Sequence, residues 1–355
     1  MRIDMFNPSY KITSKILAVL TSIAESKSVI ERAKILPQNE TKLRRQALIR
    51  MTHSSTEIEG NILNLEQVKA IVAHQKVDAP DRDIYEVENY LKALKYIGQV
   101  VLSSQAVSEK TLLKIHKFVT DRTLPEEQAG HYRKGKIFVV KRRLSLPDEV
   151  VYTGPDASKV PGLCSDLIEW LKKSEKENIN PVIVAGILHQ EIAAIHPFSD
   201  GNGRTARAMA TLVLYKRGYD FRRLFALEDY YNKDRAKYYK AINIGKNYEE
   251  RKTDLTSWLE YFVKGFQEEI DSVKAQILAL SSRKINDGIA SKIYLDKDQL
   301  KLLDFIDQVG RITIKDALDV LSCPKRTAQL KLRQLKDFGM IIQIGKGPSS
   351  AYVLK

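Results

Sequence analysis

Residues His196 to Arg207 read HPFSDGNGRTAR, and this stretch decides how the rest of the chain is understood. His196 titrates near neutral pH, so it can take a proton from an attacking hydroxyl. Asp200 offers the hard oxygen ligands that suit Mg2+ beside phosphates. Gly201 and Gly203 lack side chains, so a backbone loop can close around an anion with its N–H groups pointing inward. The stretch therefore predicts phosphate chemistry.

The residues after the glycine loop predict a helix. TARAMATLVLYKRG, residues 205–218, repeats apolar side chains at helical spacing and ends at Gly218. The loop then lies at a helix N-terminus, which favours anions. Arg204 and Arg207 share one helix face and can both reach a polyphosphate. Asn-Gly alone is also a common turn, and paired arginines are often a solvated surface. The order of residue types, with a base, an acid, a glycine loop and then two cations, favours a phosphate-binding site.

The stretch resembles the signature of the Fic family, HxFx(D/E)GNGRxxR, at every fixed position. Most members are helical enzymes that transfer AMP from ATP to a protein hydroxyl. The resemblance implies that His196 is the general base, that Phe198 packs the loop into the core, and that Asp200 binds Mg2+. It implies that the nucleotide is bound by Gly201, Asn202, Gly203, Arg204, Thr205 and Arg207, with Tyr238 and Tyr239 near the base.

The composition limits the types of protein to which the chain can belong. The chain has 355 residues, of which 43% are hydrophobic and 29% charged, as expected for a soluble protein of two or three domains. It contains no apolar run long enough for a membrane span and no signal-peptide core at its start. The two cysteines, Cys164 and Cys323, have no metal-like spacing and indicate a cytoplasmic protein. The net charge of +14 suggests an anionic partner.

The segment SSTEIEGN, residues 54–61, follows a predicted helix over residues 39–53. Its Gly-Asn end fits a left-handed helix cap, and a plain helix end followed by a turn is one interpretation. Glu57 and Glu59 oppose the macrodipole at such an end, which suggests a cationic partner.

Beside the Fic motif, the same segment resembles the inhibitory element (S/T)xxxE(G/N) of the family. Ser55, Glu59 and Gly60 occupy its fixed positions. The resemblance implies that Glu59 pairs with Arg207 and fills the space of a γ-phosphate. Asn64 is expected to cap the next helix with Gln67 in a capping box.

Residues 136–155 contain the β hairpin that the sequence predicts before the motif. KIFVVKR and EVVYTGP read as two strands, with Pro147 near the tip. An ordinary surface hairpin would have the same pattern. In the Fic family a hairpin at this place is the flap, and GHYRKGKIFV resembles the GxYR segment before it. The flap would align a target segment as an added strand and present its Ser, Thr or Tyr hydroxyl to the base.

The remaining core is predicted to be helical. Helices are expected over residues 12–36 and 82–102, after Ser108, and over residues 254–280. PVIVAGILHQEIAAI, residues 181–195, is apolar nearly all round and predicts a central buried helix that leads directly to the motif. His116 is interpreted as a packed or surface histidine rather than a catalyst, and His189 as a packing or hydrogen-bonding residue rather than a second base.

The C-terminal part is predicted to be a separate module after a polar linker, SSRKINDGIASK. Three helices and two strands follow, with Ser322 expected to cap the third helix and Gly339 to end it. This resembles a winged helix-turn-helix, a fold that binds DNA or proteins. Its recognition helix offers Lys325, Arg326, Thr327, Gln329, Lys331 and Arg333 to phosphates or bases.

The predicted fold is therefore mainly α, with an N-terminal helical region over residues 1–105, a Fic core with a flap over 106–280 and a winged-helix domain over 285–355. The predicted activity is adenylylation of protein hydroxyls, including those of the protein itself, with ATP and Mg2+. The alternatives are a nucleotide-sensing DNA-binding regulator, transfer of another nucleotide, and de-adenylylation. The target and the formation of a homodimer are left open.

Overall fold

The computed structural model describes residues 6–33, 35–103, 105–141, 149–249, 251, 254–286, 295–345 and 350–355. Contacts divide the chain into two units, residues 1–33 with 44–277, and residues 34–43 with 278–355. The tip of the expected flap, with Pro147, lies outside the described residues, as does the second half of the expected linker, residues 287–292.

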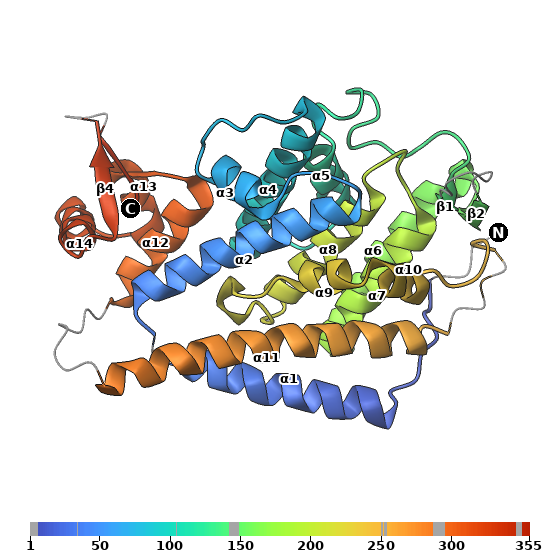
Figure 1. Ribbon diagram of the computed structural model, residues 1–355, viewed down its shortest axis with the longest axis horizontal. Helices are drawn as coiled ribbons and strands as arrows, with labels where there is room; N and C mark the ends of the chain where they lie inside the picture. The colour runs from blue at the N-terminus through green and yellow to red at the C-terminus, as the bar shows by residue number, and fades with distance from the viewer. Residues whose placement is uncertain are drawn as a thin grey trace. The chain divides into compact units, whose positions relative to one another are not determined.

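The chain up to residue 286 is mainly helical, with one hairpin among its described residues (Figure 1). Its elements are α1 (Ser14–Arg32), α2 (Pro37–Ile58), α3 (Leu65–Val72), α4 (Asp81–Leu102), α5 (Glu109–Val119), β1 (Phe138–Lys141), β2 (Glu149–Thr153), η1 (Ala157–Lys159), α6 (Val160–Lys176), α7 (Pro181–Ile195), α8 (Asn202–Lys216), η2 (Phe221–Arg223), α9 (Leu227–Lys233), α10 (Arg235–Ile242) and α11 (Thr256–Asn286).

Helix α7 is the centre of the larger unit, as its apolar sequence predicts. Its side chains are buried on all sides, and α8 packs beside it. Trp258 of α11 donates its indole N–H to the Gly186 carbonyl at 2.7 Å. A helix so enclosed cannot turn without breaking the core, so it fixes the position of the residue that follows it, His196.

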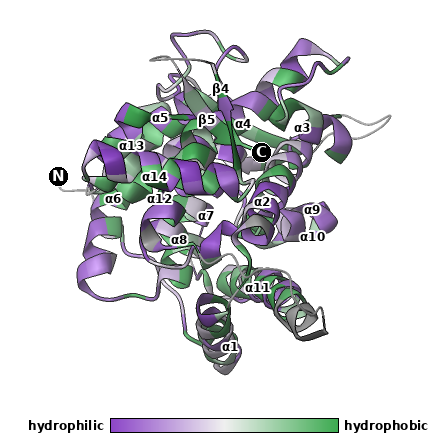
Figure 2. Ribbon diagram, turned by 90° about the vertical axis from the view of Figure 1, so that its left-hand side faces the viewer, coloured by the Kyte–Doolittle hydropathy of each residue, from purple (hydrophilic) through white to green (hydrophobic). Residues whose placement is uncertain are grey.

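Helices α1 and α11 lie side by side at the edge of this unit (Figure 1). Thr13 donates to Glu260 at 2.8 Å, and Ser26 donates to Asp271 at 3.2 Å. Both helices carry hydrophilic and hydrophobic residues in Figure 2, as expected when one face packs and the other meets water. No described helix is long and apolar enough to cross a membrane.

A buried ion pair anchors the segment between α10 and α11 to the central helix. Arg251 donates to Glu191 of α7 at 2.6 Å, and both side chains are almost fully enclosed. Tyr248 also donates to Glu191, at 2.8 Å. Because both charges are out of water, each depends on the other to be tolerated in the core.

Strands β1 and β2 form the expected antiparallel hairpin. The register pairs Phe138 with Thr153 and Lys141 with Glu149, with an irregularity between Val139 and Val140. Tyr152 anchors the hairpin by donating to the Ala194 carbonyl at the end of α7, at 3.0 Å. The hairpin is therefore attached beside the loop that follows α7.

The second unit contains a small sheet and three helices among its described residues from 295 onwards. The elements are α12 (Lys297–Val309), β3 (Ile312–Thr313), α13 (Ile314–Leu321), α14 (Lys325–Asp337), β4 (Ile341–Ile344) and β5 (Ala351–Leu354), with sheet order β3-β5-β4. Leu302, Ile306 and Leu332 lie in its own hydrophobic core.

Several boundaries differ from those predicted. Helix α2 starts at Pro37 and continues to Ile58, so the SSTEIEGN segment is mostly helical. Helix α11 continues to Asn286, because the polar residues where the linker was expected are also compatible with a helix. Strand β3 was missed, since two residues are too short for a periodic signal.

Two capping predictions had opposite outcomes. Asn64 caps α3 and forms the expected capping box with Gln67, which confirms the prediction. Ser322 is wrong as the cap of α14, because it adopts a left-handed conformation at the C-terminus of α13. The residue before α14 is Pro324, which makes no side-chain cap.

The buried pair of Arg251 and Glu191 generates a prediction about stability. Replacing Arg251 with Met should lower the free energy of unfolding by roughly 3–5 kcal/mol, because it leaves a buried carboxylate without its cation. Both tryptophans of the chain, Trp170 and Trp258, lie in the larger unit, so their fluorescence during urea unfolding measures the loss.

Lys159→Ala is the matched control, since Lys159 pairs with Glu249 at 3.2 Å but both side chains are about half exposed. This substitution should cost less than about 1 kcal/mol. Similar losses in the two variants would contradict a structural role for the buried pair.

Candidate active site

The loop over residues 196–201 joins α7 to α8 and is held from within. His196 ends α7 in a left-handed conformation, and Gly201 precedes the first residue of α8. The Asn202 side chain accepts from the Phe198 N–H and donates to the Phe198 carbonyl, both at 2.9 Å. The side-chain amide of Asn202 is therefore used to hold the loop, and its backbone N–H lies in the first turn of α8.

His196 is held in the tautomer that a general base needs. Its Nδ1 lies 3.1 Å from the Ala193 carbonyl, an acceptor, so Nδ1 carries the proton and Nε2 keeps its lone pair. Burial lowers the pKa of this imidazole below its usual value. His196 is therefore neutral at pH 7, with Nε2 able to accept a proton.

Phe198 and His116 brace the loop from the other side. Their rings stack with centroids 3.6 Å apart and nearly parallel planes. His116 Nδ1 accepts from the Gly130 N–H at 2.9 Å, so its Nε2 donates to the Asp200 carbonyl at 3.0 Å. Burial lowers the pKa of His116 to about 4. The sequence interpretation of His116 as a packing residue agrees with this position.

Arg133, in the GHYR segment, connects the loop to the flap. The buried guanidinium donates to the carbonyls of His196 at 2.8 Å, Gly135 at 2.7 Å and Pro155 at 2.6 Å. Its backbone N–H donates to the Pro197 carbonyl at 3.0 Å. One cation thus fixes the spacing between the base and the hairpin, and this role was not predicted from the sequence.

Arg207 of α8 is buried and bound by the end of α2. Its Nε donates to Ser55 Oγ at 3.0 Å, and Nη2 donates to the Ser55 carbonyl at 2.8 Å and to Glu59 Oε1 at 2.7 Å. The pairing of Glu59 with Arg207 that the sequence suggested is thus present in the structure. Gly60 follows at φ 97°, a conformation that glycine adopts without strain, and it ends the helix.

The Glu59 carboxylate also lies directly against the glycine loop. A Cβ atom added to Gly203 would come within 2.2 Å of Glu59 Oε1. The carboxylate therefore lies in the first turn of α8, where backbone N–H groups have no acceptor within the helix. This is the position in which an anion would be bound, and Glu59 now supplies the negative charge there.

Polar contacts on a second face of α2 hold this end in place. Ser54 donates to Asp229 of α9 at 2.6 Å. Glu57 accepts from Asn232 at 2.5 Å and pairs with Arg235 at 3.0 Å. Glu57 therefore points away from Arg207, as its place two residues before Glu59 predicts.

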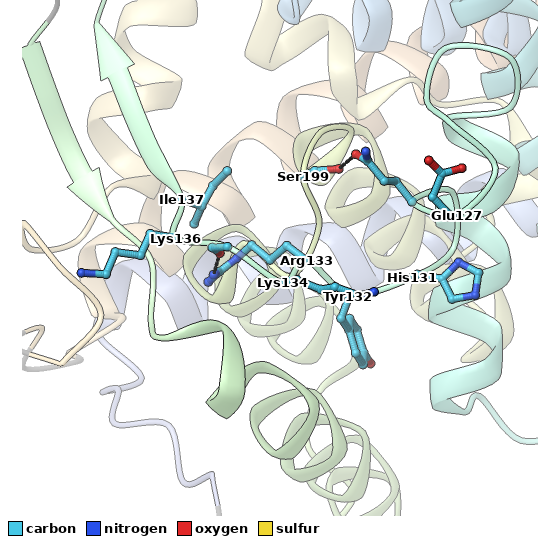
Figure 3. Close-up of a pocket in the computed structure, with 10 residues that line it drawn as sticks. Glu127, His131, Tyr132, Arg133, Lys134, Lys136, Ile137 and Ser199 are labelled. Carbon is cyan, nitrogen blue, oxygen red and sulfur yellow. Dashed lines mark hydrogen bonds between the residues drawn. The ribbon is translucent and has the colours of Figure 1, made fainter.

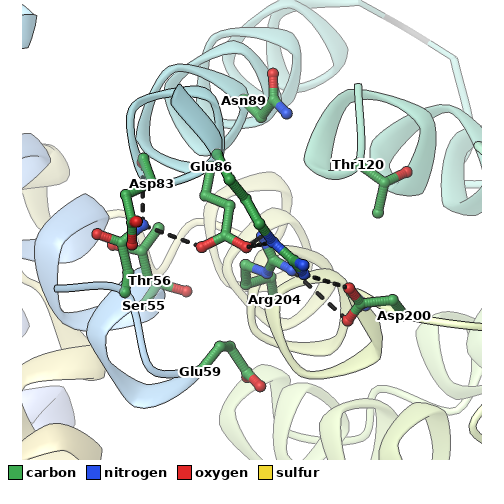
Figure 4. A network of polar contacts seen from close by, with 12 residues as sticks. Ser55, Thr56, Glu59, Asp83, Glu86, Asn89, Thr120, Asp200 and Arg204 are labelled. Atoms are coloured by element: carbon green, nitrogen blue, oxygen red, sulfur yellow. Dashed lines mark hydrogen bonds and ion pairs between the residues drawn. The ribbon is translucent and has the colours of Figure 1, made fainter. Parts of the chain in front are cut away.

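Arg204 lies buried between two carboxylates (Figure 4). Its Nη1 is 3.5 Å from Glu86 of α4, and its Nη2 is 3.8 Å from Asp200. Asn61 donates to the other oxygen of Glu86 at 3.0 Å. Within the described part of the chain, the Nε and Nη1 atoms of Arg204 have no hydrogen-bond acceptor. Two buried donors without acceptors suit an anionic ligand.

Asp200, which the family resemblance assigns to Mg2+, is a partly exposed carboxylate beside the glycine loop. Its side chain is half exposed at the N-terminus of α8, and its Oδ1 accepts from the Gly201 N–H at 2.6 Å. No group of three or more His, Cys, Asp or Glu side chains in the described chain could hold a metal by itself. Mg2+ commonly uses one or two carboxylates with water and substrate phosphates, so a single Asp200 fits this ion in a nucleotide complex.

The residues expected near the nucleotide base differ in accessibility. Tyr238 is buried, and its hydroxyl lies 3.0 Å from His189 Nε2, so His189 is a packed, hydrogen-bonded residue as expected. Tyr239 is 40% exposed and donates to the Ile58 carbonyl at 3.1 Å. Thr205 is fully buried. Only Tyr239 of the two tyrosines offers its ring to a ligand, and its contact with adenine stays a prediction.

A cavity of about 370 Å3 opens beside the loop and below the flap (Figure 3). Ser199 lies on one side and donates to Gln128 at 2.9 Å. The segment 131–137 forms the opposite wall and includes the exposed Lys134 and Lys136. This space is separate from the Glu59 contact and lies on the flap side of the loop.

Comparison with known proteins agrees with this geometry. Residues 106–214 match the Fic/DOC family. The protein adenylyltransferase Fic of Nematostella vectensis is 31% identical over 179 residues, covering 49% of this chain and 39% of that protein. The corresponding protein of Drosophila willistoni is 28% identical over 204 residues, or 57% and 37%. The match thus spans less than half the length of these relatives.

Two solved structures show the same fold. A Fic family protein from Desulfovibrio desulfuricans G20 has 25% identity and a TM-score of 0.62, covering 99% of this chain and 98% of its own. Fic-1 from C. elegans has 22% identity and a TM-score of 0.59, covering 76% and 73%. The chain therefore has a Fic fold and is a distant relative of protein adenylyltransferases.

The buried state of His116 predicts a pH-dependent stability. The unfolded imidazole titrates near pH 6.5 and the folded one near pH 4, so the unfolded state binds more protons between these values. Stability should therefore fall as the pH drops from 6.5 to 4. His116 alone should contribute a loss of about 2 kcal/mol between pH 7 and pH 5.

The measurement is urea unfolding at pH 7 and pH 5 for the wild type and His116→Phe. The Phe ring can keep the stack on Phe198 but does not titrate, so its loss over this range should be smaller by about 2 kcal/mol. His189 and His196 are present in both proteins and cancel. Equal losses of stability between pH 7 and pH 5 in the two proteins would mean that His116 is not buried as a neutral ring.

Proposed function

We propose that this protein transfers AMP from ATP to a hydroxyl side chain of a protein and that Glu59 restrains this activity. The observation that carries the proposal is the neutral His196, with Nε2 available, in the loop that leads to the helix N-terminus bearing Arg204 and Arg207. The match of residues 106–214 to the Fic/DOC family supports the reaction class.

In the proposed reaction, Nε2 of His196 takes the proton of the target hydroxyl as its oxygen attacks the α-phosphorus of ATP. The bond between the α-phosphorus and the oxygen leading to the β-phosphate breaks, and pyrophosphate leaves. The bond from Nδ1 to Ala193 keeps the base in its working tautomer and stabilises the imidazolium that forms. Arg133 holds the His196 carbonyl and thereby the distance from base to flap.

The other residues would stabilise charge and position the nucleotide. The unpaired donors of Arg204 suit phosphate oxygens, and Arg207 becomes available to the γ-phosphate when Glu59 leaves. Mg2+ held by Asp200 would neutralise charge on the triphosphate. The protein makes no covalent bond to the nucleotide in this scheme, so orientation and electrostatics supply the rate.

The flap is the proposed docking site for the target. Within the described residues, β1 pairs only with β2, so its outer edge presents backbone groups to a further strand. Phe138, Val140 and Val150 are about half exposed on this hairpin and would contact the target side chains. A segment added here would place a Ser, Thr or Tyr hydroxyl near the loop.

The same site would also accept other nucleotides or act in reverse on an adenylylated protein. Neither the base His196 nor the arginines distinguish these reactions, because each requires a proton transfer and a stabilised phosphate. The identity of the nucleotide and the direction of the reaction therefore have to be established by experiment.

A second function is proposed for the smaller unit, namely binding of duplex DNA by a winged-helix module. The element order α12-β3-α13-α14-β4-β5 has the arrangement of that class, with α14 in the place of the recognition helix. Lys325, Arg326 and Arg333 are exposed on α14, whereas its Leu332 and Leu335 enter the core. A basic exposed face on an otherwise packed helix favours an anionic partner.

The transferase proposal predicts mass addition to the protein itself. Purified protein with Mg2+ and labelled ATP, CTP, GTP or UTP should gain one AMP unit from ATP, measured by intact mass spectrometry. His196→Ala should reduce the rate by about 10²–10⁴-fold. His74→Ala, at an exposed histidine after α3, is the control and should retain the rate. Wild-type transfer by a folded His196→Ala protein would refute the assigned base.

The contact of Glu59 predicts a release of activity when the carboxylate is removed. Glu59→Gly should raise self-adenylylation by roughly 10²-fold, the scale of one restored phosphate contact. Glu57→Gly should do much less, because Glu57 pairs with Arg235 and Asn232 on another face. Initial rates of AMP addition by the two variants test this, and equal effects would refute inhibition through Arg207.

The second function predicts salt-dependent DNA binding by the full chain. Arg326→Ala and Arg333→Ala should each weaken binding to duplex DNA and reduce the salt slope by about one. Lys301→Ala, on the exposed side of α12, should leave both unchanged. Fluorescence anisotropy between low and moderate salt gives the slopes. Binding that is insensitive to the α14 substitutions would reject this helix as the DNA contact.

A further inference from the structure

Four charged side chains form a closed ring beside the glycine loop, which we call the charge ring: Arg82, Glu86, Arg204 and Asp200. Arg82 Nε lies 3.4 Å from Glu86, which lies 3.5 Å from Arg204. Arg204 lies 3.8 Å from Asp200, and Asp200 Oδ2 lies 3.3 Å from Arg82 Nη2. Charges alternate around the ring, and three of its members are labelled in Figure 4.

The ring engages both oxygens of the carboxylate that was assigned to the metal. Oδ1 of Asp200 accepts from the Gly201 N–H and faces Arg204, while Oδ2 faces Arg82. A cation bound to this carboxylate would therefore compete with an arginine that is already there. Two cations on one carboxylate also repel each other, more strongly when one is divalent.

The two arginines of the ring differ in how easily they can leave. Arg204 is only 2% exposed and lies between Glu86 and Asp200, so moving it would leave Glu86 buried with one cation fewer. Arg82 is 67% exposed, in the first turn of α4, and Glu86 would still hold its Nε after it left Asp200. An exposed ion pair contributes about 0–1 kcal/mol, so its rupture is cheap.

We propose that Arg82 is a positioning residue that occupies the Asp200 carboxylate when no nucleotide is bound and is displaced from it by Mg2+ bound with the nucleotide. This inference rests on the proposed function, because it takes Asp200 as the Mg2+ ligand. Arg82 keeps Asp200 turned toward α4 in the empty site and raises the Mg2+ concentration that nucleotide binding requires. Binding of Mg2+ then breaks the charge ring at the ion pair between Arg82 and Asp200.

The proposal gives a reason for an exposed arginine beside a carboxylate that other groups already stabilise. Asp200 already accepts from the Gly201 N–H, and the α8 macrodipole stabilises its charge. Arg82 adds a charge that can be removed, whereas the backbone donor stays. Exchange of Arg82 for a divalent ion leaves the loop itself unchanged, because the Asp200 carbonyl is still held by His116.

Equilibrium binding of ATP as a function of Mg2+ tests the role of Arg82 independently of transfer. The full chain carries Glu59→Gly in every sample, so that Arg207 is free, and binding is measured by isothermal titration calorimetry. Arg82→Ala should lower the Mg2+ concentration for half-maximal binding by about three- to fivefold, the equivalent of losing a pair of 0.6–1 kcal/mol. Arg82→Lys should still compete with Mg2+ for Asp200 in part, so this Mg2+ concentration should fall less than in Arg82→Ala.

Lys92→Ala is the matched control. Lys92 lies on the same helix and pairs with Asp121 at 2.8 Å, but it does not contact Asp200. Its removal should leave the Mg2+ dependence unchanged, which separates competition at Asp200 from a general loss of positive charge on α4.

The outcomes distinguish this inference from the function on which it rests. Equal Mg2+ dependence with and without Arg82 would overturn the role of Arg82 alone. Weaker ATP binding in Arg82→Ala at every Mg2+ concentration would also overturn it, since Arg82 would then contact the phosphates. Absence of Mg2+-dependent ATP binding in all variants would overturn the nucleotide site itself. Mg2+-dependent binding without AMP transfer would reject only the proposed reaction.

Discussion

The buried guanidinium of Arg207 is the constraint on which the arrangement of the site depends. A cation enclosed by protein needs charge and hydrogen-bond partners, because the lost hydration is worth several kcal/mol. Ser55, in the last turn of α2, supplies two acceptors, and Glu59, the residue after the helix, supplies the negative charge. The end of α2 must therefore lie against α8 whenever no other anion is present, and no external ligand is needed to complete the core.

Helix geometry lets α2 perform this role while being anchored elsewhere. Ser55 and Glu59 are four residues apart and share the face toward Arg207, whereas Ser54 and Glu57 are three apart and share the face toward α9 and α10. The second set fixes the rotation of the helix, and the first set then meets the arginine. A change in either face would alter the other through the rigid backbone between them.

The sequence predicted the parts of the site whose residues are close in the chain. The motif over residues 196–207 and the central helix before it are local patterns, and the structure places them as expected. Glu86 was missed, and Arg133 was noted only within the GxYR resemblance without a role, because each acts on the loop from a distant segment. Their partners are defined only by the fold.

The predictions that were wrong for the second unit failed for a similar reason. Strand β3, Ile312–Thr313, was not predicted because two residues carry no period, and its partner β5 lies far along the chain. Ser322 was taken as a cap because its side chain suits that role. Its left-handed backbone instead ends α13, since the cap of α14 is set by where Pro324 forces the helix to begin.

In the candidate site, carboxylates of the protein lie against both buried arginines, where the proposed function places phosphates. Glu59 faces Arg207, and Glu86 and Asp200 face Arg204, so each buried cation is partly neutralised before a ligand arrives. In the proposed function, phosphate binding is an exchange of anions, and its net free energy is the small difference between two similar sets of contacts. Since Glu86 is buried and Glu59 is more exposed, the exchange is easier at Arg207 than at Arg204. In the proposed function, regulation by a carboxylate therefore belongs at Arg207, because its partner Glu59 is less buried than Glu86 beside Arg204.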